Sequence, residues 1–247
     1  MKPIYLLAAA AAVFAGAACD AKKGTDGAAT AAAAKPVKPP ANGDWSTIVA
    51  ATPAGGFMMG NPAAKVQLIE LGSMTCPHCG EFDELGVPTL VEKYVKTGRV
   101  AWEFRNYTRD SLDLTAALIT RCNGAKSFFP LTRAMYADQK NWFAKVQAAP
   151  PAEQQAAQSL GPDRQFTALA KLAGFQQWAA MRGVPTAKSA QCLANQDAVN
   201  RLVQLTSDAN SQFPEFKGTP SFVINGKMVE GATWKALEPQ LRQAIGA

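Results

Sequence analysis

The spacing of apolar residues predicts a strand, a helix and a second strand in the first folded part of the chain. Val66–Leu71 is a largely apolar segment with the length of a buried strand. Apolar residues then recur at helical spacing from about Pro77; Pro88 is expected to kink or restart that helix, and Gly98 to end it. Across Arg99–Tyr107 apolar and polar residues alternate, which is typical of a strand.

The middle of the chain, residues 112–212, contains no convincing strand pattern. It is rich in Ala, Leu, Gln and Lys, and Pro150-Pro151 and Gly161-Pro162 punctuate it. We therefore expect an all-helical block of about four or five helices.

A hairpin that begins with a proline, followed by a last helix, is predicted near the C-terminus. Residues 220–224 form the first strand, Asn225-Gly226 suits a type I′ turn, and residues 227–230 form the returning strand. Apolar residues then recur every four positions across Leu237–Ile245, although Pro239 leaves the start of this helix open.

The first residues of the chain have the pattern of an export signal. A lysine precedes the apolar stretch Ile4–Ala18, so residues 1–18 are predicted to be a signal peptide. Cys19 follows in a setting that resembles a bacterial lipoprotein signal, but Gly16 replaces the usual Leu, so ordinary cleavage is the alternative. Residues 19–43 have almost no large apolar side chains and are predicted to be a disordered tether. The expected location is the periplasm, with a lipidated Cys19 as the candidate membrane anchor.

The composition favours a soluble globular protein. Hydrophobic residues make up 48% and charged residues 18% of the chain, which fits one elaborated domain or two small ones. The net charge of +6 comes from dispersed Lys and Arg residues without interleaved aromatics. Nucleic acid is therefore not an expected partner.

The candidate chemistry lies in Cys76-Pro77-His78-Cys79, at the predicted strand-to-helix junction. Two thiols at this spacing at a helix start can interconvert between dithiol and disulfide. Because a helix N-terminus stabilises a thiolate, Cys76 is expected to be the exposed nucleophile and Cys79 the shielded resolving thiol. Pro77 can occupy the first helical turn. His78, the only histidine of the chain, is expected to donate to or charge-stabilise the Cys76 thiolate.

A structural disulfide or half of a zinc site is the alternative for Cys76 and Cys79. Zinc sites use four ligands, usually as two close pairs, and the chain has no second CxxC motif and no second histidine. We therefore expect no metal, and no cofactor other than a redox-active Cys76–Cys79 disulfide.

The order of these elements resembles the DsbA-like branch of the thioredoxin superfamily. The segments that carry the resemblance are Glu70–Cys79 and Gly218–Gly226, and it covers about residues 56–243. It implies an α/β protein, a thioredoxin fold with an inserted all-helical domain. The implied segments are 44–111 for the N-terminal part of the thioredoxin domain, 112–212 for the helical insertion, and 213–247 for the C-terminal hairpin and helix.

The resemblance also implies roles for three further residues. The proline at the position of Pro220 is cis in thioredoxin-like folds and lies against the disulfide, which leaves the backbone of Thr219 free to pair with an extended substrate strand. An ordinary proline at a strand start is the alternative. Glu70 matches in position a buried acid that lies beneath the active site in the family. A carboxylate in an apolar strand is expected to have a raised pKa and to relay the proton of Cys79, and the alternative is a strand-end glutamate that reaches solvent or a lysine.

Cys122 and Cys192 lie in the predicted helical block. Cysteines outside the redox motif tend to form disulfides in an oxidising compartment, and some relatives of the family carry a second, non-catalytic disulfide in the helical domain. A Cys122–Cys192 disulfide is therefore expected, and two free buried thiols are the alternative.

Three functions remain open. The first is an exported thiol:disulfide oxidoreductase, expected to be monomeric, that introduces disulfides into reduced, extended exported proteins and is re-oxidised by a membrane redox partner. Thr219 is also common among isomerase relatives, so a reductase or isomerase is the second. The third is a non-catalytic periplasmic chaperone that binds peptides in the groove.

Overall fold

The computed structural model describes residues 38–246, apart from the side chains of Pro162 and Asp163. These residues belong to one compact unit. The predicted signal peptide, Cys19 and most of the predicted tether lie outside the described residues.

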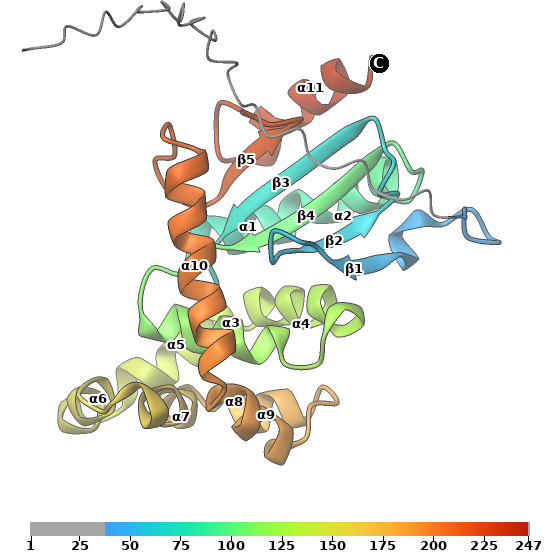
Figure 1. Cartoon of the computed structure of the whole chain (residues 1–247). Helices are drawn as coiled ribbons and strands as arrows, with labels where there is room; N and C mark the ends of the chain where they lie inside the picture. Colours follow the sequence, from blue (N-terminus) through green and yellow to red (C-terminus); the bar gives the residue numbers. More distant parts are fainter. Residues whose placement is uncertain (1–37, 247) are drawn as a thin grey trace, which may run out of the picture. The chain divides into compact units, whose positions relative to one another are not determined.

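The described residues form a mixed sheet at one end of this unit (Figure 1). Among the described residues the sheet has six strands: β1 (Val49–Ala51), β2 (Phe57–Gly60), β3 (Val66–Gly72), β4 (Val100–Asn106), β5 (Ser221–Ile224) and β6 (Lys227–Met228). Their order across the sheet is β1-β2-β4-β3-β5-β6. The central strands β3 and β4 are parallel, and the other neighbours are antiparallel. Both central strands form where the apolar pattern predicted them.

Strands β1 and β2 were not predicted. They have three and four residues, too few for an alternating pattern to stand out. β2 pairs with β4, and β1 pairs with β2 at the edge of the sheet after a short 3₁₀ helix, η1 (Trp45–Thr47).

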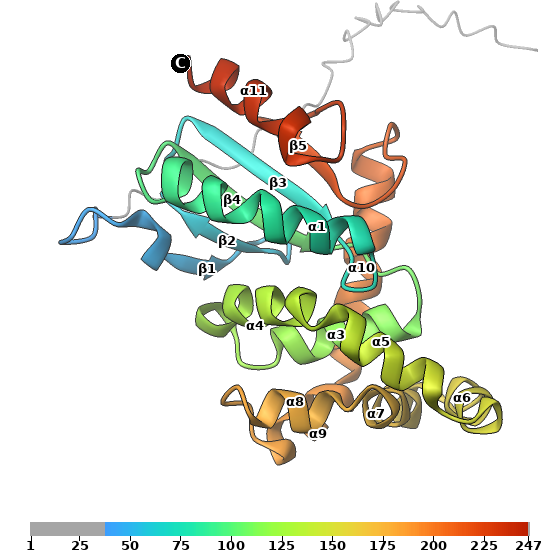
Figure 2. The same ribbon diagram turned by 180° about the vertical axis from the view of Figure 1, so that it is seen from behind.

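The helix that follows β3 covers one face of the sheet. It consists of α1 (Pro77–Leu85), α2 (Val87–Thr89) and a π-helical segment, η2 (Leu90–Val95). Pro88 lies in the first turn of α2, so the predicted restart is confirmed, and Gly98 follows the end of the segment with a φ of +75°. Figure 2 shows α1 in front of β3 and β4, and Figure 1 shows it behind them.

The helical block is divided more finely than predicted. The expectation of about four or five helices is wrong, because residues 111–212 form eight in the described structure. They are α3 (Ser111–Arg121), α4 (Ala125–Ala137), α5 (Gln139–Ala148), α6 (Pro151–Gln158), α7 (Pro162–Ala173), α8 (Phe175–Ala180), α9 (Thr186–Leu193) and α10 (Gln196–Gln212). Very short breaks separate several of them, as at Gly124 and Gly174, where φ is +75° and +74°. Glycine adopts such angles without steric cost, and an isolated glycine hardly changes an Ala-rich pattern.

The C-terminal elements agree with the prediction. Asn225 and Gly226 both have positive φ between β5 and β6, as a type I′ turn requires. The last helix, α11 (Trp234–Ile245), starts after the N-cap Thr233 and continues through Pro239.

Alternate residues of β3 face two separate hydrophobic clusters. Leu68 belongs to the larger cluster, which includes residues of α1, the helical block and α11. Leu71 belongs to a smaller cluster with Phe213 and Val223, next to the end of α10. Because side chains alternate along a strand, Glu70 points to the same face as Leu68, the face covered by α1. Helix α10 packs on the opposite face and also contacts β4 and α3, which joins the helical block to the sheet (Figure 1).

Candidate active site

The two cysteines of the CxxC motif lie where β3 passes into α1. Cys76 is the N-cap of α1, and Cys79 lies in its first turn. Both are free thiols, and Cys79 is fully buried, whereas Cys76 is 3% exposed. The expectation of an exposed Cys76 is therefore wrong. Its Sγ donates to the carbonyl oxygen of Thr219 at 3.0 Å, so the loop before β5 covers it, although it is still the more accessible of the two.

The surroundings of Cys76 favour its thiolate. They lower the pKa of Cys76 from 9.0 to about 5. The largest cause is a hydrogen bond from the Cys79 thiol; the Thr219 side chain and the backbone N–H groups of Cys79 and His78 act in the same direction, against the effect of burial. The predicted direction of the pKa change at the helix start is confirmed.

The structure differs from the expectation for the imidazole of His78. This side chain is 77% exposed, and its Nδ1 lies 3.4 Å from Oε2 of Glu81. The described structure records no hydrogen bond between the imidazole and Cys76; the contribution of this residue comes from its backbone N–H group. The reason is its place on the solvent side of the first turn of α1, next to the exposed Pro77.

The thiol of Cys79 is held in its neutral form. Burial is the largest cause that raises its pKa, and the neighbouring Cys76 and Glu70 add to it. The backbone N–H of Ser73 donates to Cys79 Sγ at 3.5 Å and acts in the opposite direction. These features suit a shielded thiol, as predicted for Cys79.

Glu70 is a buried acid beneath the CxxC motif. It is 1% exposed, and its Oε2 accepts a hydrogen bond of 3.1 Å from Nε1 of Trp102. Burial raises its pKa, with the charge of Asp83 as the next cause. The alternative of a solvent-facing glutamate is wrong, and the proton-relay role stays a prediction.

The Thr219–Pro220 segment lies against Cys76. The peptide bond between Thr219 and Pro220 is cis, as predicted, and Pro220 is buried. Oγ1 of Thr219 is also buried and has no hydrogen-bond partner among the described residues. Beside this segment is a pocket of about 690 Å³, lined by residues 217–221 and by the chain from Met228 to Ala232.

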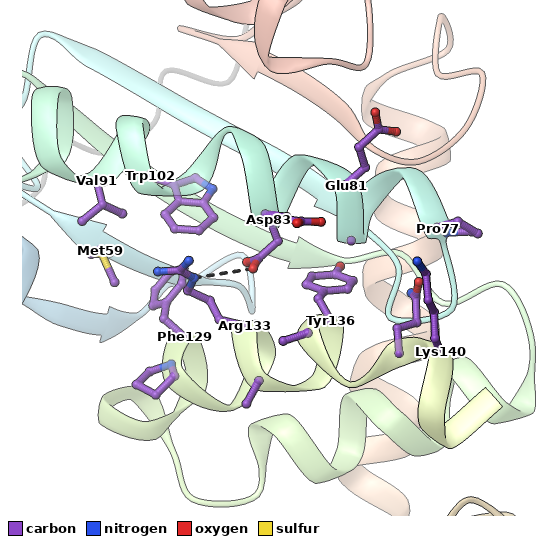
Figure 3. A pocket seen from close by; sticks show the side chains of 16 residues that line it. Met59, Pro77, Glu81, Asp83, Val91, Trp102, Phe129, Arg133, Tyr136 and Lys140 are labelled. Atoms are coloured by element: carbon purple, nitrogen blue, oxygen red, sulfur yellow. Dashed lines mark hydrogen bonds and ion pairs between the residues drawn. The ribbon is translucent and has the colours of Figure 1, made fainter. Parts of the chain in front are cut away.

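A larger pocket lies between α1 and α4, with a volume of about 1130 Å³ (Figure 3). Asp83 of α1 and Arg133 of α4 face each other across it, with Oδ2 and Nε 3.5 Å apart. Burial raises the pKa of Asp83 to about 6, against the effect of the Arg133 guanidinium. No local pattern indicates this pair, because its members lie on helices 50 positions apart in the chain.

The helical block holds the loop that leads into Cys76. The hydroxyl of Tyr136 donates to the carbonyl oxygen of Ser73 at 3.1 Å. Nε2 of Gln139 donates to the carbonyl oxygens of Met74 and Cys76, at 2.8 and 3.1 Å. Neither residue was predicted, since a tyrosine and a glutamine within a helical segment carry no local sign of such contacts.

The predicted pairing of the remaining two cysteines within the described residues is confirmed. Cys122 and Cys192 form a disulfide with their Cα atoms 5.6 Å apart. It joins the end of α3 to α9, and the alternative of two free thiols is wrong.

Two further observations concern residues 38–246. The side chains described in this range include no group of three or more from His, Cys, Asp or Glu arranged to hold a metal ion. None of its helices has both the length and the apolar character needed to cross a membrane.

Known proteins share this fold. A family model described as thioredoxin matches residues 52–243. One similar solved structure is that of a protein-disulfide isomerase from Novosphingobium aromaticivorans. The two sequences are 34% identical, and the structures match with a TM-score of 0.73 over 77% of this chain and 97% of that chain. The structure of α-DsbA1 from Wolbachia pipientis has the same fold, with a TM-score of 0.61 at 22% identity over 76% of this chain and 90% of that chain.

Curated relatives include a Rickettsia prowazekii protein whose name provisionally assigns it to the protein-disulfide oxidoreductases. It is 27% identical over 198 residues, which cover 76% of this chain and 64% of that protein. The chain thus spans slightly less than two thirds of the length of the first curated relatives it matches. With most of its length matched by the family model, the chain belongs to the thioredoxin family, and it has the fold of the DsbA-like proteins.

Proposed function

We propose that this protein is an exported thiol:disulfide oxidoreductase that introduces disulfides into other proteins. The observation that carries the proposal is Cys76 at the start of α1, with its pKa lowered to about 5 beside the buried thiol of Cys79. A low pKa stabilises the reduced form of the pair, and a couple with a stabilised reduced form is a stronger oxidant.

The proposed reaction starts from a Cys76–Cys79 disulfide. A substrate thiolate attacks Sγ of Cys76, the bond between Cys76 and Cys79 breaks, and Cys79 leaves and takes a proton. A second substrate thiolate then attacks the substrate sulfur of the mixed disulfide, so that a substrate disulfide forms and Cys76 leaves as a thiolate. The substrate loses two electrons, and the cysteine pair, the redox group of this proposal, gains them.

Glu70 is proposed to relay the proton that Cys79 takes up or releases. It is buried on the face of the sheet covered by α1, and its charge affects the pKa of Cys79. Burial raises the pKa of Glu70, which favours the protonated carboxyl group that a proton relay uses.

Reduced, extended exported proteins are the proposed substrates. The pocket beside Thr219 and Pro220 adjoins Cys76 through the Thr219 carbonyl group. An extended chain that pairs with the backbone of this segment would present a cysteine to the active site. Turnover further requires a membrane redox partner that takes two electrons from the reduced pair and restores the disulfide.

The proposed location is the periplasm, for a monomer anchored in a membrane through a lipidated Cys19. Support comes from the export-signal pattern of residues 1–18. Palmitate labelling of the wild type and of Cys19→Ala tests the anchor. Label that persists in the variant would exclude it.

Disulfide isomerisation is the second candidate function. Thr219 supports it, because threonine at this position is also common among isomerase relatives. The 34% identical structure from Novosphingobium aromaticivorans also bears the name of a protein-disulfide isomerase. Thiol exchange at Cys76 would be the same chemical step in both functions.

The reduction potential, measured together with two ribonuclease assays, separates these functions. An oxidase is expected to have a potential more oxidising than glutathione and to form disulfides in reduced ribonuclease. An isomerase would restore scrambled ribonuclease instead. A strongly reducing potential without oxidase activity would overturn the proposal.

A further inference from the structure

A buried carboxylate at the start of α3 binds the loop between β3 and Cys76. Asp113 is 1% exposed. Its Oδ1 accepts the backbone N–H of Met74 at 2.8 Å. Its Oδ2 accepts the hydroxyl of Ser73 at 2.6 Å and the backbone N–H of Arg109 at 3.0 Å. Two of these three donors belong to the active-site loop.

Arg109 binds the same loop from the segment that precedes α3. Its Nε donates to Oγ of Ser73 at 2.9 Å, and its Nη2 donates to Oγ1 of Thr75 at 2.8 Å. The Ser73 hydroxyl therefore donates to Asp113 and accepts from Arg109, which fixes its orientation. Thr75 directly precedes Cys76, so the network reaches the first cysteine of the motif.

Ser73 transmits this arrangement to the second cysteine. Its carbonyl group is bound by Tyr136, its side chain by Asp113 and Arg109, and its N–H group donates to Sγ of Cys79 at 3.5 Å. This N–H group acts against the burial that disfavours the Cys79 thiolate. The direction in which this N–H group points depends on the contacts that hold the carbonyl group and the side chain of Ser73.

We propose that Asp113 is a positioning residue for the resolving thiol, which it serves by fixing Ser73 so that the Ser73 N–H group stabilises the Cys79 thiolate. The inference rests on the proposed thiol exchange and adds a residue to it. Asp113 touches neither reacting sulfur. It acts on the step in which Cys79 attacks Cys76 in a mixed disulfide.

In this step the Cys79 thiol gives its proton to water, its sulfur attacks Sγ of Cys76, and the Cys76–Cys79 bond forms. The bond between Cys76 and the partner sulfur breaks, and the partner leaves as a thiolate that takes a proton from water. The protein pair loses the two electrons that the partner disulfide gains over the whole reaction.

A role limited to the start of α3 does not account for the contacts of Asp113. The N-cap of α3 is Asp110, whose Oδ1 accepts the backbone N–H of Asp113 at 2.8 Å. The helix start is thus capped by another carboxylate. The side chain of Asp113 instead reaches Ser73 and Met74, 40 and 39 positions away in the chain.

The test follows reduced full-length protein as it reacts with glutathione disulfide. Samples are quenched with acid, and mass spectrometry measures the mixed disulfide between Cys76 and glutathione and its conversion to the Cys76–Cys79 disulfide. The variants are Asp113→Asn, whose amide N–H group faces at least one backbone N–H donor in either orientation, and Ser73→Ala, which lacks the linking hydroxyl. Asp110→Asn is the matched control, because it removes the same charge from the same helix start and retains a good N-cap.

We expect the mixed disulfide to form at a similar rate in all four proteins. Its resolution is expected to be about tenfold slower in Asp113→Asn, the effect of weakening one hydrogen bond to a charged group, and several-fold slower in Ser73→Ala. The pH at which resolution reaches half its maximal rate should rise in both variants. Asp110→Asn should resolve at the wild-type rate.

The inference is overturned if either folded variant resolves the mixed disulfide at the wild-type rate with an unchanged pH profile. It is also overturned if formation and resolution slow equally, which would indicate a general distortion of the loop. Circular dichroism and an intact Cys122–Cys192 disulfide establish folding, and Ser73→Ala carries the test if Asp113→Asn does not fold. Wild type that exchanges with glutathione disulfide but fails to oxidise ribonuclease contradicts the proposed direction of the reaction and leaves this comparison valid.

Discussion

At the scale of single residues, the groups around Cys76 stabilise its thiolate more than its thiol. Hydrogen bonds from Cys79, Thr219 and two backbone N–H groups outweigh the effect of burial. The protonated sulfur uses its own hydrogen to bind the Thr219 carbonyl group, while Oγ1 of Thr219 has no partner among the residues described. Ionisation of Cys76 gives that hydroxyl an acceptor.

The reduced protein should gain stability from the Cys76 thiolate as the pH rises. The pKa of Cys76 is about 5 in the folded protein and near 8.5 in an unfolded chain, so the stabilisation is fully present above about pH 8.5 and is lost as the pH falls through 5. Relative to the oxidised protein, the free energy of unfolding of the reduced protein should rise by about 2–3 kcal/mol between pH 6 and pH 8. Urea unfolding of both forms at the two pH values measures this. Reduced Cys76→Ser should show no such rise, and a pH-independent difference in the wild type would contradict the lowered pKa.

Thr219→Val should raise the pKa of Cys76 by about one to two units, because it removes a hydrogen bond to a charged sulfur. The thiol form should not lose stability, since the deleted hydroxyl has no partner there. The absorbance of the thiolate at 240 nm as a function of pH gives the value. Thr167→Val, at an exposed position on α7, is the control. An unchanged titration would show that the threonine hydroxyl does not reach the thiolate.

At the scale of elements, α3 lies between the active-site loop and the second disulfide, and it contacts both. Its first turn carries Asp113, which binds the active-site loop, and its C-terminal end carries Cys122, which is bonded to Cys192 of α9. The disulfide joins residues separated by 70 positions in the chain, and a cross-link of that span acts mainly by restricting the unfolded chain.

Replacing both Cys122 and Cys192 by alanine should lower the free energy of unfolding by up to about 4 kcal/mol. The estimate follows from the entropy lost when a cross-link joins residues separated by 70 positions. Chemical denaturation of wild type and variant, both with Cys76 and Cys79 oxidised, gives the difference. Equal denaturation midpoints for the two proteins would contradict this prediction. They would mean that the disulfide does not further restrict the conformations of the unfolded helical block.

At the scale of the whole described unit, one hydrophobic cluster runs through the sheet and the helical block. Trp102 of β4 packs against Phe129 of α4 with tilted rings, and Phe57 of β2 lies 4.3 Å from Phe128 of α4, measured between ring centroids. The two parts therefore share side chains in one core. Such sharing couples their unfolding.

The described unit should therefore unfold in one transition. Tryptophan fluorescence and far-ultraviolet circular dichroism are expected to give coincident urea curves, because Trp102 reports on the sheet, Trp142 and Trp178 report on the helical block, and circular dichroism reports mainly on helices. Two separated curves would show that the helical block is an independent domain.

Local patterns predicted the centre of the fold and the reacting residues. The strand Val66–Leu71 and the helix start at Pro77 follow from side-chain periodicity and proline preference, which need no knowledge of distant contacts. The contacts of Asp113 depend on how the start of α3 lies beside the loop that follows β3, which no short segment encodes. The pairing of Cys122 with Cys192 needed the expected compartment and the family resemblance in addition to the residues.

The exposed imidazole of His78 makes the active site visible to one simple spectroscopic experiment. Because the chain has one histidine, its proton NMR spectrum should contain a single imidazole Cε1–H resonance that needs no assignment. The ring lies on the turn between the two cysteines and is 77% exposed. Its chemical shift should therefore differ between the dithiol, the mixed disulfide and the disulfide, so each redox state can be followed without a label.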